Sequence, residues 1–252
     1  MTRRILHLNA FIISLLLMGS LAFMGCEPQE KSNSSRGPAA NTDSMPLQPE
    51  TAEVAEEETE LAFPEELRPT IPAGFELVEG EEGPVWSVGD LNGDGLADAG
   101  MLVRKTDDFD NHSAVVVSLG KQGGGYSFKE STGNLGPEPL QYTDPDFVYI
   151  EEGYLYIAFQ SMRWGIDLVF EWMPETQEMI LVSSETLSSG NEFGDGAGTA
   201  RTDYVKGSRI SAYQRWNEKM GRSIMETPKT ISVPKVLHPL KDLNDDLIYE
   251  LQ

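Results

Sequence analysis

Alternate residues of one short loop are able to direct several oxygen atoms toward a single cation. The loop runs from Asp90 to Asp98 and reads Asp-Leu-Asn-Gly-Asp-Gly-Leu-Ala-Asp. A hard cation such as Ca²⁺ prefers oxygen ligands at this spacing, and a glycine at the sixth position permits the sharp turn between them. The sequence therefore predicts a Ca²⁺ site. Its ligands are the side chains at positions one, three, five and nine and the carbonyl at position seven: Asp90, Asn92, Asp94, Asp98 and Leu96.

The residues around the loop distinguish it from an EF-hand. An EF-hand places a bidentate Glu at position twelve, where this chain has Met101. Residues 84–88 and 101–104 are rich in β-branched and aromatic residues and predict strands on both sides. The structural alternative is an Asx/Gly turn between two strands that binds nothing.

A strand–loop–strand of this kind resembles the FG-GAP (VCBS, integrin α-like) calcium loop. The resemblance extends over most of residues 71–230, through a Val-rich strand ending in Leu119-Gly120, an Arg163-Trp164 strand and a Tyr-x-x-Gly hairpin at 204–207. It implies a β fold and one structural Ca²⁺ rather than a particular activity. One loop is too few for a closed, repeat-built propeller.

Short β-branched and aromatic runs separated by Gly, Pro and Asp turns surround the loop. This pattern predicts an all-β fold: an antiparallel meander of hairpins that forms blade-like sheets or a sandwich. For residues 242–250 we expect at most a short terminal turn or strand. The expected hairpins pair 113–119 with 126–129, 147–151 with 154–160, 166–172 with 179–183, and 204–205 with 208–214.

The first part of the chain predicts export and anchoring. Residues 1–25 combine Arg3 and Arg4 with a short apolar run, and Leu-Ala-Phe-Met-Gly precedes Cys26, which resembles a bacterial lipobox. We expect residues 1–25 to be a lipoprotein signal peptide and Cys26 to carry the lipid; an uncleaved membrane anchor is the alternative. Residues 26–70 lack hydrophobic periodicity and predict a disordered acidic tether, so the β domain is placed at 71–252.

Charge restricts the partners. The chain has a formal charge of −22, which argues against nucleic acid and against adsorption to an anionic membrane surface. The single cysteine excludes an intramolecular disulfide. Together with the predicted signal peptide and lipid anchor, these features lead us to expect a cell-envelope location. The domain would face the periplasm or the cell exterior, and the lipid on Cys26 would contact the membrane.

Other groups of residues are weaker candidates for a metal, binding or catalytic site. Residues 107–112 predict a solvated loop, residues 190–198 an acidic loop, and Asp242, Asn244 and Asp246 mimic three ligand positions without the required glycine. No set of nucleophile and base is present for nucleophilic catalysis. An aromatic-rich middle predicts core packing or, if exposed, a ligand face. It comprises Tyr142, Tyr149, Tyr154, Tyr156, Trp164 and Trp172.

Three functions remain open on this evidence. The favoured one is a non-enzymatic binding module, stabilised by Ca²⁺, for an envelope protein or glycan. The second is an enzyme acting on envelope polymers, such as a carboxylate-based glycoside hydrolase. The third is a purely structural envelope component. An exposed aromatic platform favours the binder, a cleft with two buried carboxylates the enzyme, and a uniformly polar surface the structural role.

Overall fold

The structure is a computed structural model of the whole chain. It describes residues 63–80, 83–107, 112–136, 147–161, 163–191 and 193–251. The predicted signal peptide, Cys26 and nearly all of the predicted tether lie outside these residues.

A five-stranded antiparallel sheet carries the loop at residues 90–98, which is the predicted Ca²⁺ site. The order is β1-β5-β6-β7, and β4 pairs with β5 beside β1. The loop connects β4 to β5, so strands flank it on both sides as predicted. The bounds are β1 (Phe75–Leu77), β4 (Trp86–Gly89), β5 (Asp98–Lys105), β6 (Ser113–Gly120) and β7 (Tyr126–Ser131), with a small separate pair β2 (Glu79–Gly80) and β3 (Gly83–Pro84).

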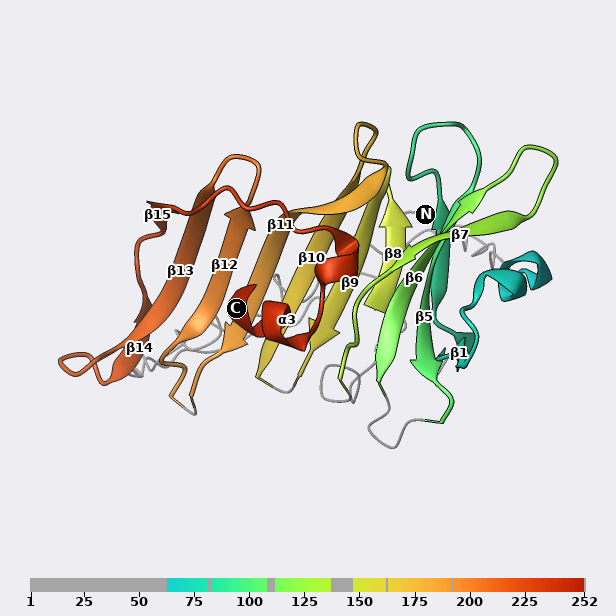
Figure 1. The fold of residues 1–252 in the computed structure, drawn as a ribbon. Helices are drawn as coiled ribbons and strands as arrows, with labels where there is room; N and C mark the ends of the chain where they lie inside the picture. Colours follow the sequence, from blue (N-terminus) through green and yellow to red (C-terminus); the bar gives the residue numbers. More distant parts are fainter. Residues whose placement is uncertain are drawn as a thin grey trace, which may run out of the picture. The chain divides into compact units, whose positions relative to one another are not determined.

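An eight-stranded antiparallel sheet contains most of the described residues from Phe147 onward (Figure 1). Its order is β14-β13-β12-β11-β10-β9-β8, and β15 pairs with β13 on the same edge as β14. Successive strands are neighbours, which is the predicted meander. The bounds are β8 (Val148–Glu151), β9 (Tyr154–Gln160), β10 (Trp164–Met173), β11 (Glu178–Ser189), β12 (Ala197–Asp203), β13 (Ser208–Asn217), β14 (Arg222–Met225) and β15 (Lys229–Ser232).

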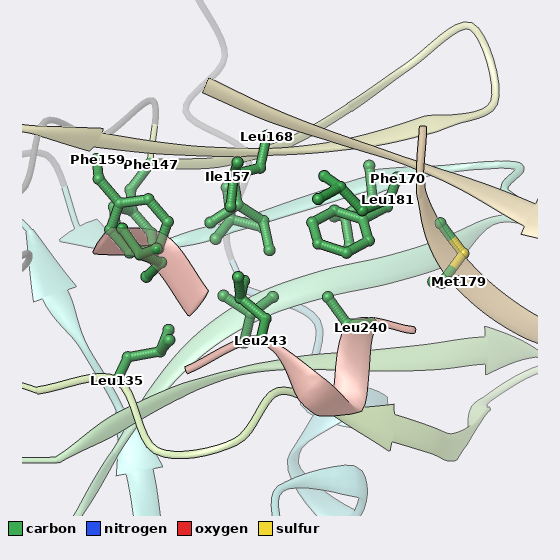
Figure 2. Close-up of a cluster of buried hydrophobic side chains, with 14 of the residues drawn as sticks. Leu135, Phe147, Ile157, Phe159, Leu168, Phe170, Met179, Leu181, Leu240 and Leu243 are labelled. Atoms are coloured by element: carbon green, nitrogen blue, oxygen red, sulfur yellow. The ribbon is translucent and has the colours of Figure 1, made fainter. Parts of the chain in front are cut away.

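The C-terminal segment covers one face of the large sheet. It forms the 3-10 helix η3 (Leu240–Asp242) and the helix α3 (Asp245–Leu251), which lie in front of the central strands in Figure 1. Strand β9 alternates buried Leu155, Ile157 and Phe159 with more exposed residues. These buried side chains, together with those of β10 and β11, pack against the apolar residues of the two helices (Figure 2). We call this the inner face of the sheet and the opposite one the outer face.

The two large sheets share this core. Val85, Leu102 and Val115 of the first part belong to the same buried cluster as the β9 side chains. Close backbone approach supports the junction: the amide of Ile150 donates to Ser87 Oγ at 3.0 Å, and a Cβ on Gly89 would lie 2.4 Å from Ile150 Cγ2. The residue at position 89 is therefore restricted to glycine by packing between β4 and β8.

The predicted all-β fold class is confirmed, and three local predictions are corrected. Residues 204–205 lie in the turn after β12, and β12 itself is the partner of β13; its Ala-Gly-Thr-Ala start has too few bulky residues to indicate a strand. Residues 245–251 form a helix, begun by Asn244, whose Oδ1 accepts the Leu247 amide at 2.9 Å.

The third correction concerns the start of the folded region. Residues 65–70, assigned to the tether, form the 3-10 helix η1 (Glu65–Thr70). Leu67 is fully buried with Leu77, Met101 and Val116 in a second core cluster on the other side of the first sheet. One buried leucine among acidic residues is too weak a pattern to reveal this from the sequence.

Candidate functional site

The backbone amides of the loop at residues 90–98 point toward its own side-chain oxygens. Asp90 accepts the amides of Gly93 and Gly95 at 2.8 and 2.9 Å. Asn92 Oδ1 accepts the Asp94 amide at 2.9 Å, and Asp94 Oδ1 accepts the Leu96 amide at 2.8 Å. Gly93 and Gly95 have φ angles of 74° and 82°, a left-handed conformation that glycine adopts without strain. These hydrogen bonds and the two glycine conformations therefore give the loop a defined shape.

Asp98 has a different role from the other acidic residues of the loop. Its side chain is fully buried at the start of β5. One carboxylate oxygen accepts the Leu91 amide and the other the Gly120 amide, both at 2.9 Å. Burial raises the pKa of Asp98, and the amide hydrogen bonds oppose this rise. Asp98 thus fixes the loop to the end of β6.

The donors of the loop match the chemistry of a hard cation, because all are oxygen atoms: three carboxylates, one amide and one carbonyl. Asp94 is exposed, and Asp90 and Asn92 are half-buried, so solvent reaches these three side chains. Across the described parts of the chain, no three His, Cys, Asp or Glu side chains are grouped closely enough to hold a metal ion. The Ca²⁺ site therefore stays a prediction from the loop chemistry.

The loop lies beside the β8–β9 turn of the large sheet. A Cβ placed on Gly153 would be 3.6 Å from the carbonyl oxygen of Asp90. Together with the hydrogen bond from the Ile150 amide to Ser87, this contact places the loop next to the hairpin that carries Tyr149, Tyr154 and Tyr156. The loop and that hairpin are therefore close neighbours.

The outer face of the large sheet carries three half-buried tyrosines near the β8–β9 turn. The rings of Tyr149 and Tyr156 stack with centroids 4.5 Å apart and planes 3° apart. Tyr154 approaches Tyr156 edge-on at 6.5 Å. Along β9, Tyr154 and Tyr156 alternate with the buried Leu155 and Ile157, and Tyr149 pairs with Tyr156. The three tyrosines therefore lie on the face opposite to the buried residues. Of the predicted alternatives for these tyrosines, the structure favours a surface position over the core.

Acidic side chains adjoin the tyrosines on the same face. Strand pairing places Ala158, Asp167, Glu185 and Arg201 in one row across β9 to β12, and paired residues of antiparallel strands share a face. Asp167 and Glu185 are therefore direct cross-strand neighbours of like charge. Burial, and secondarily Glu185, raises the pKa of Asp167 to about 6. We refer to Tyr149, Tyr154, Tyr156, Asp167 and Glu185 as the tyrosine–acid face.

The sequence did not single out Asp167, Glu185 or Arg201. The alternating pattern at 166–170 places Asp167 opposite in face to Ile166 and Leu168, which is a readable signal. The pairing with Glu185 depends on strand register, and a bulge shifts that register between Val169 and Phe170. Neither this pairing nor the bulge can be read from the sequence of a single strand.

Several residues of the weaker candidate sites have structural roles. Asn244 caps helix α3, and both carboxylate oxygens of Asp245 accept the Gly136 amide at 2.8 Å. Asp195, in the predicted acidic loop, accepts the Trp216 amide at 2.8 Å. Trp164 and Trp172 pack at the border of the core. Tyr142, Cys26 and residues 108–111 lie outside the described residues.

No protein-family model, no curated protein and no solved structure matches the chain. In the described part of the chain, no helix is both long and apolar enough to cross a membrane. The resemblance to the FG-GAP loop thus stays a prediction based on residues 90–98 and their flanking strands.

Proposed function

We propose that the protein is a lipid-anchored cell-envelope protein whose β domain, stabilised by Ca²⁺, binds an envelope protein or glycan without enzymatic activity. The lipobox-like sequence before Cys26 supports the anchor and the envelope location. The acidic residues 26–62 support a tether that holds the domain away from the membrane, because charged linkers repel themselves and extend.

The observation that carries the binding function is the tyrosine–acid face. Stacked and edge-on tyrosines present flat rings with polar ends, which suits the apolar faces and hydroxyls of sugars and also the mixed surface of a protein. Neighbouring carboxylates add hydrogen-bond acceptors for hydroxyl groups or cationic side chains. Such a surface is not uniformly polar, which favours a binding role over the structural one.

Ca²⁺ has a stabilising role in this proposal. Asp90, Asn92, Asp94, Asp98 and the carbonyl of Leu96 would hold it, and the ion would supply local positive charge among carboxylates. Because the loop contacts the β8–β9 turn, holding the loop also holds the hairpin that carries the tyrosines.

The test is retention of an envelope component by the purified protein. Envelope extract and isolated envelope glycans are passed over immobilised wild-type protein and over the variant Tyr156→Ala. Phe128→Ala is the matched control, because Phe128 is 49% exposed on β7 in the other sheet. We expect the wild type and Phe128→Ala to retain the same component and Tyr156→Ala to lose it. Equal retention by all three proteins contradicts the proposal.

One observation favours the second function, a carboxylate-based glycoside hydrolase. Burial raises the pKa of Asp167 to about 6 beside Glu185, and a carboxyl group with a raised pKa next to a second carboxyl group is the pairing that such enzymes use. Release of reducing ends from envelope glycans, abolished in both Asp167→Asn and Glu185→Gln, would establish the hydrolase and overturn the non-enzymatic proposal.

A further inference from the structure

Negative charge dominates the four strands that carry the tyrosine–acid face. Residues 148–189, which contain β8 to β11, hold seven Asp and Glu residues and a single basic residue, Arg163, a formal charge of −6. The other strands of the same sheet have the opposite balance, because residues 197–237 hold eight Lys and Arg residues and three acids. The electrostatic field near a surface follows the local charge. The tyrosine–acid face therefore lies in the negative half of its sheet.

Two further acidic side chains lie beside the tyrosines on the outer face. Strand pairing places Tyr154 between Glu151 of β8 and Glu171 of β10, and paired residues of antiparallel strands share a face. The stacked rings of Tyr149 and Tyr156 lie in the next row along the strands, and the acidic pair of β10 and β11 lies in the row beyond them. Carboxylates therefore border the ring pair on both sides.

The acidic pair in that last row has no neutralising partner among the described residues. Asp167 and Glu185 are half-buried cross-strand neighbours, and neither side chain has an ion pair or a hydrogen bond with another described residue. Arg201 follows Glu185 in the row and is exposed, without an ion pair between them. Like charges opposite each other destabilise a sheet. A bound cation relieves this repulsion, because an opposite charge favours the ionised carboxylates.

The stacking of two tyrosines limits what they are able to bind. The ring centroids of Tyr149 and Tyr156 are 4.5 Å apart and the planes differ by 3°, so each ring covers one face of the other. A neutral sugar stacks on an open aromatic face. Tyrosine hydroxyls and carboxylates instead accept hydrogen bonds from ammonium and guanidinium groups. The polar groups on this face therefore suit Lys and Arg side chains better than a neutral sugar.

From these observations we infer that the tyrosine–acid face binds an extended, positively charged polypeptide segment of an envelope protein. The inference rests on the proposed binding function and names the chemical class of its partner. Asp167 and Glu185 hold one basic side chain of the segment, and Glu151 and Glu171 hold a second one beside Tyr154.

The spacing of the two acidic pairs specifies the spacing of the basic residues. Asp167 and Glu171 are four positions apart on β10, which is a separation of about 13 Å at about 3.3 Å per residue. In an extended segment, residues four positions apart have the same separation and lie on the same side of the chain. Basic residues at this spacing therefore reach both acidic pairs at once.

The test measures the binding of labelled synthetic peptides to the purified full chain in nonionic detergent by fluorescence anisotropy. One peptide carries two Arg residues four positions apart in a Gly-Ser background. A second carries them three positions apart, on opposite sides of an extended chain, and a third carries Glu in place of Arg. We expect the first peptide to bind several-fold more tightly than the second, and the third not to bind. Added salt should weaken binding.

Variants locate the binding to this face. Asp167→Asn/Glu185→Gln removes two charges and retains the size of both side chains, and we expect it to raise the Kd of the first peptide by about tenfold. Asp107→Asn/Glu218→Gln is the matched control, because it makes the same changes at exposed residues elsewhere, and it should bind as the wild type does. A melting temperature at or above that of the wild type verifies that the variants fold.

The inference is overturned if the first peptide does not bind, or if it binds the wild type and Asp167→Asn/Glu185→Gln equally. Equal affinity for the two Arg spacings overturns the alignment with the two acidic pairs. Oligomers of glucosamine and of N-acetylglucosamine are measured beside the peptides, and tighter binding of the glucosamine oligomer than of the first peptide overturns the inference in favour of a cationic glycan.

Failure of this inference and failure of the proposed function give different results. If the peptides do not bind but the wild type retains an envelope component that Tyr156→Ala loses, the binding function stands and its partner is not a basic segment. If the wild type retains no envelope component and binds no peptide, the proposed function and the inference both fail.

Discussion

Substitution of Asp98 tests how the loop at residues 90–98 is fixed to the domain in the absence of metal. In Asp98→Asn, one of the two carboxylate oxygens becomes an amide nitrogen, which faces the amide of Leu91 or of Gly120 as a second donor. Both amides now donate to the carboxylate at 2.9 Å in a buried position. The substitution therefore removes one charged hydrogen bond and weakens the other.

The expected cost follows from these contacts. A hydrogen bond to a charged group contributes about 1.5–3 kcal/mol, and the burial that raises the pKa of Asp98 offsets part of it. We expect Asp98→Asn to lose about 2–3 kcal/mol of unfolding free energy. For a domain of this size, that is a fall in Tm of roughly 4–12 °C.

The assay is urea and thermal unfolding in excess EDTA, so that metal does not contribute. Asp94→Asn is the control, because Asp94 is exposed and its bond to the Leu96 amide competes with water; we expect it to cost less than about 1 kcal/mol. The reasoning is refuted if Asp98→Asn melts with the wild type in EDTA, or if Asp94→Asn costs as much.

Two further predictions concern pH and the start of the domain. Asp167 has a folded pKa of about 6 against about 3.9 when unfolded, so the folded state holds the extra proton and stability falls as pH rises from about 4 to 6. Asp167→Asn should therefore gain roughly 1–2 kcal/mol at pH 7.5 and nothing near pH 4, measured by urea unfolding at both; a gain independent of pH would contradict the assignment. Leu67→Ala should cost about 2–5 kcal/mol because Leu67 is fully buried, whereas Leu61→Ala in the predicted tether should cost little. Equal melting of the two variants would place residue 67 in the tether.

The strands were predictable where local chemistry repeats. Apolar and polar residues alternate in 154–160, and Glu152-Gly153 marks a tight turn, so the β8–β9 hairpin was expected from the residues alone. Strand β12 was missed because its Ala, Gly and Thr residues have little bulk, and the long-range pairing with β11 and β13 determines its conformation.

The candidate sites also differ in whether local sequence was enough to predict them. The loop at residues 90–98 has its candidate donors within nine residues, so their spacing alone was enough to predict a site there. The tyrosine–acid face combines residues from β8 to β11, and a bulge changes the register inside it. Likewise, one carboxylate oxygen of Asp98 accepts the amide of Gly120, which is 22 residues away. The sequence gives no information on such contacts without the strand pairing.

Calcium-dependent melting tests the central claim most directly. Sites of this class outside the cell have Kd values of about 10⁻⁴–10⁻³ M, so about 10 mM Ca²⁺ should stabilise the wild type by roughly 1.4–2.7 kcal/mol. The corresponding rise in Tm is about 3–10 °C. Asp94→Ala should abolish this rise while it melts near the wild type in EDTA. A wild-type Tm that Ca²⁺ leaves unchanged would show that residues 90–98 form only a turn between two strands.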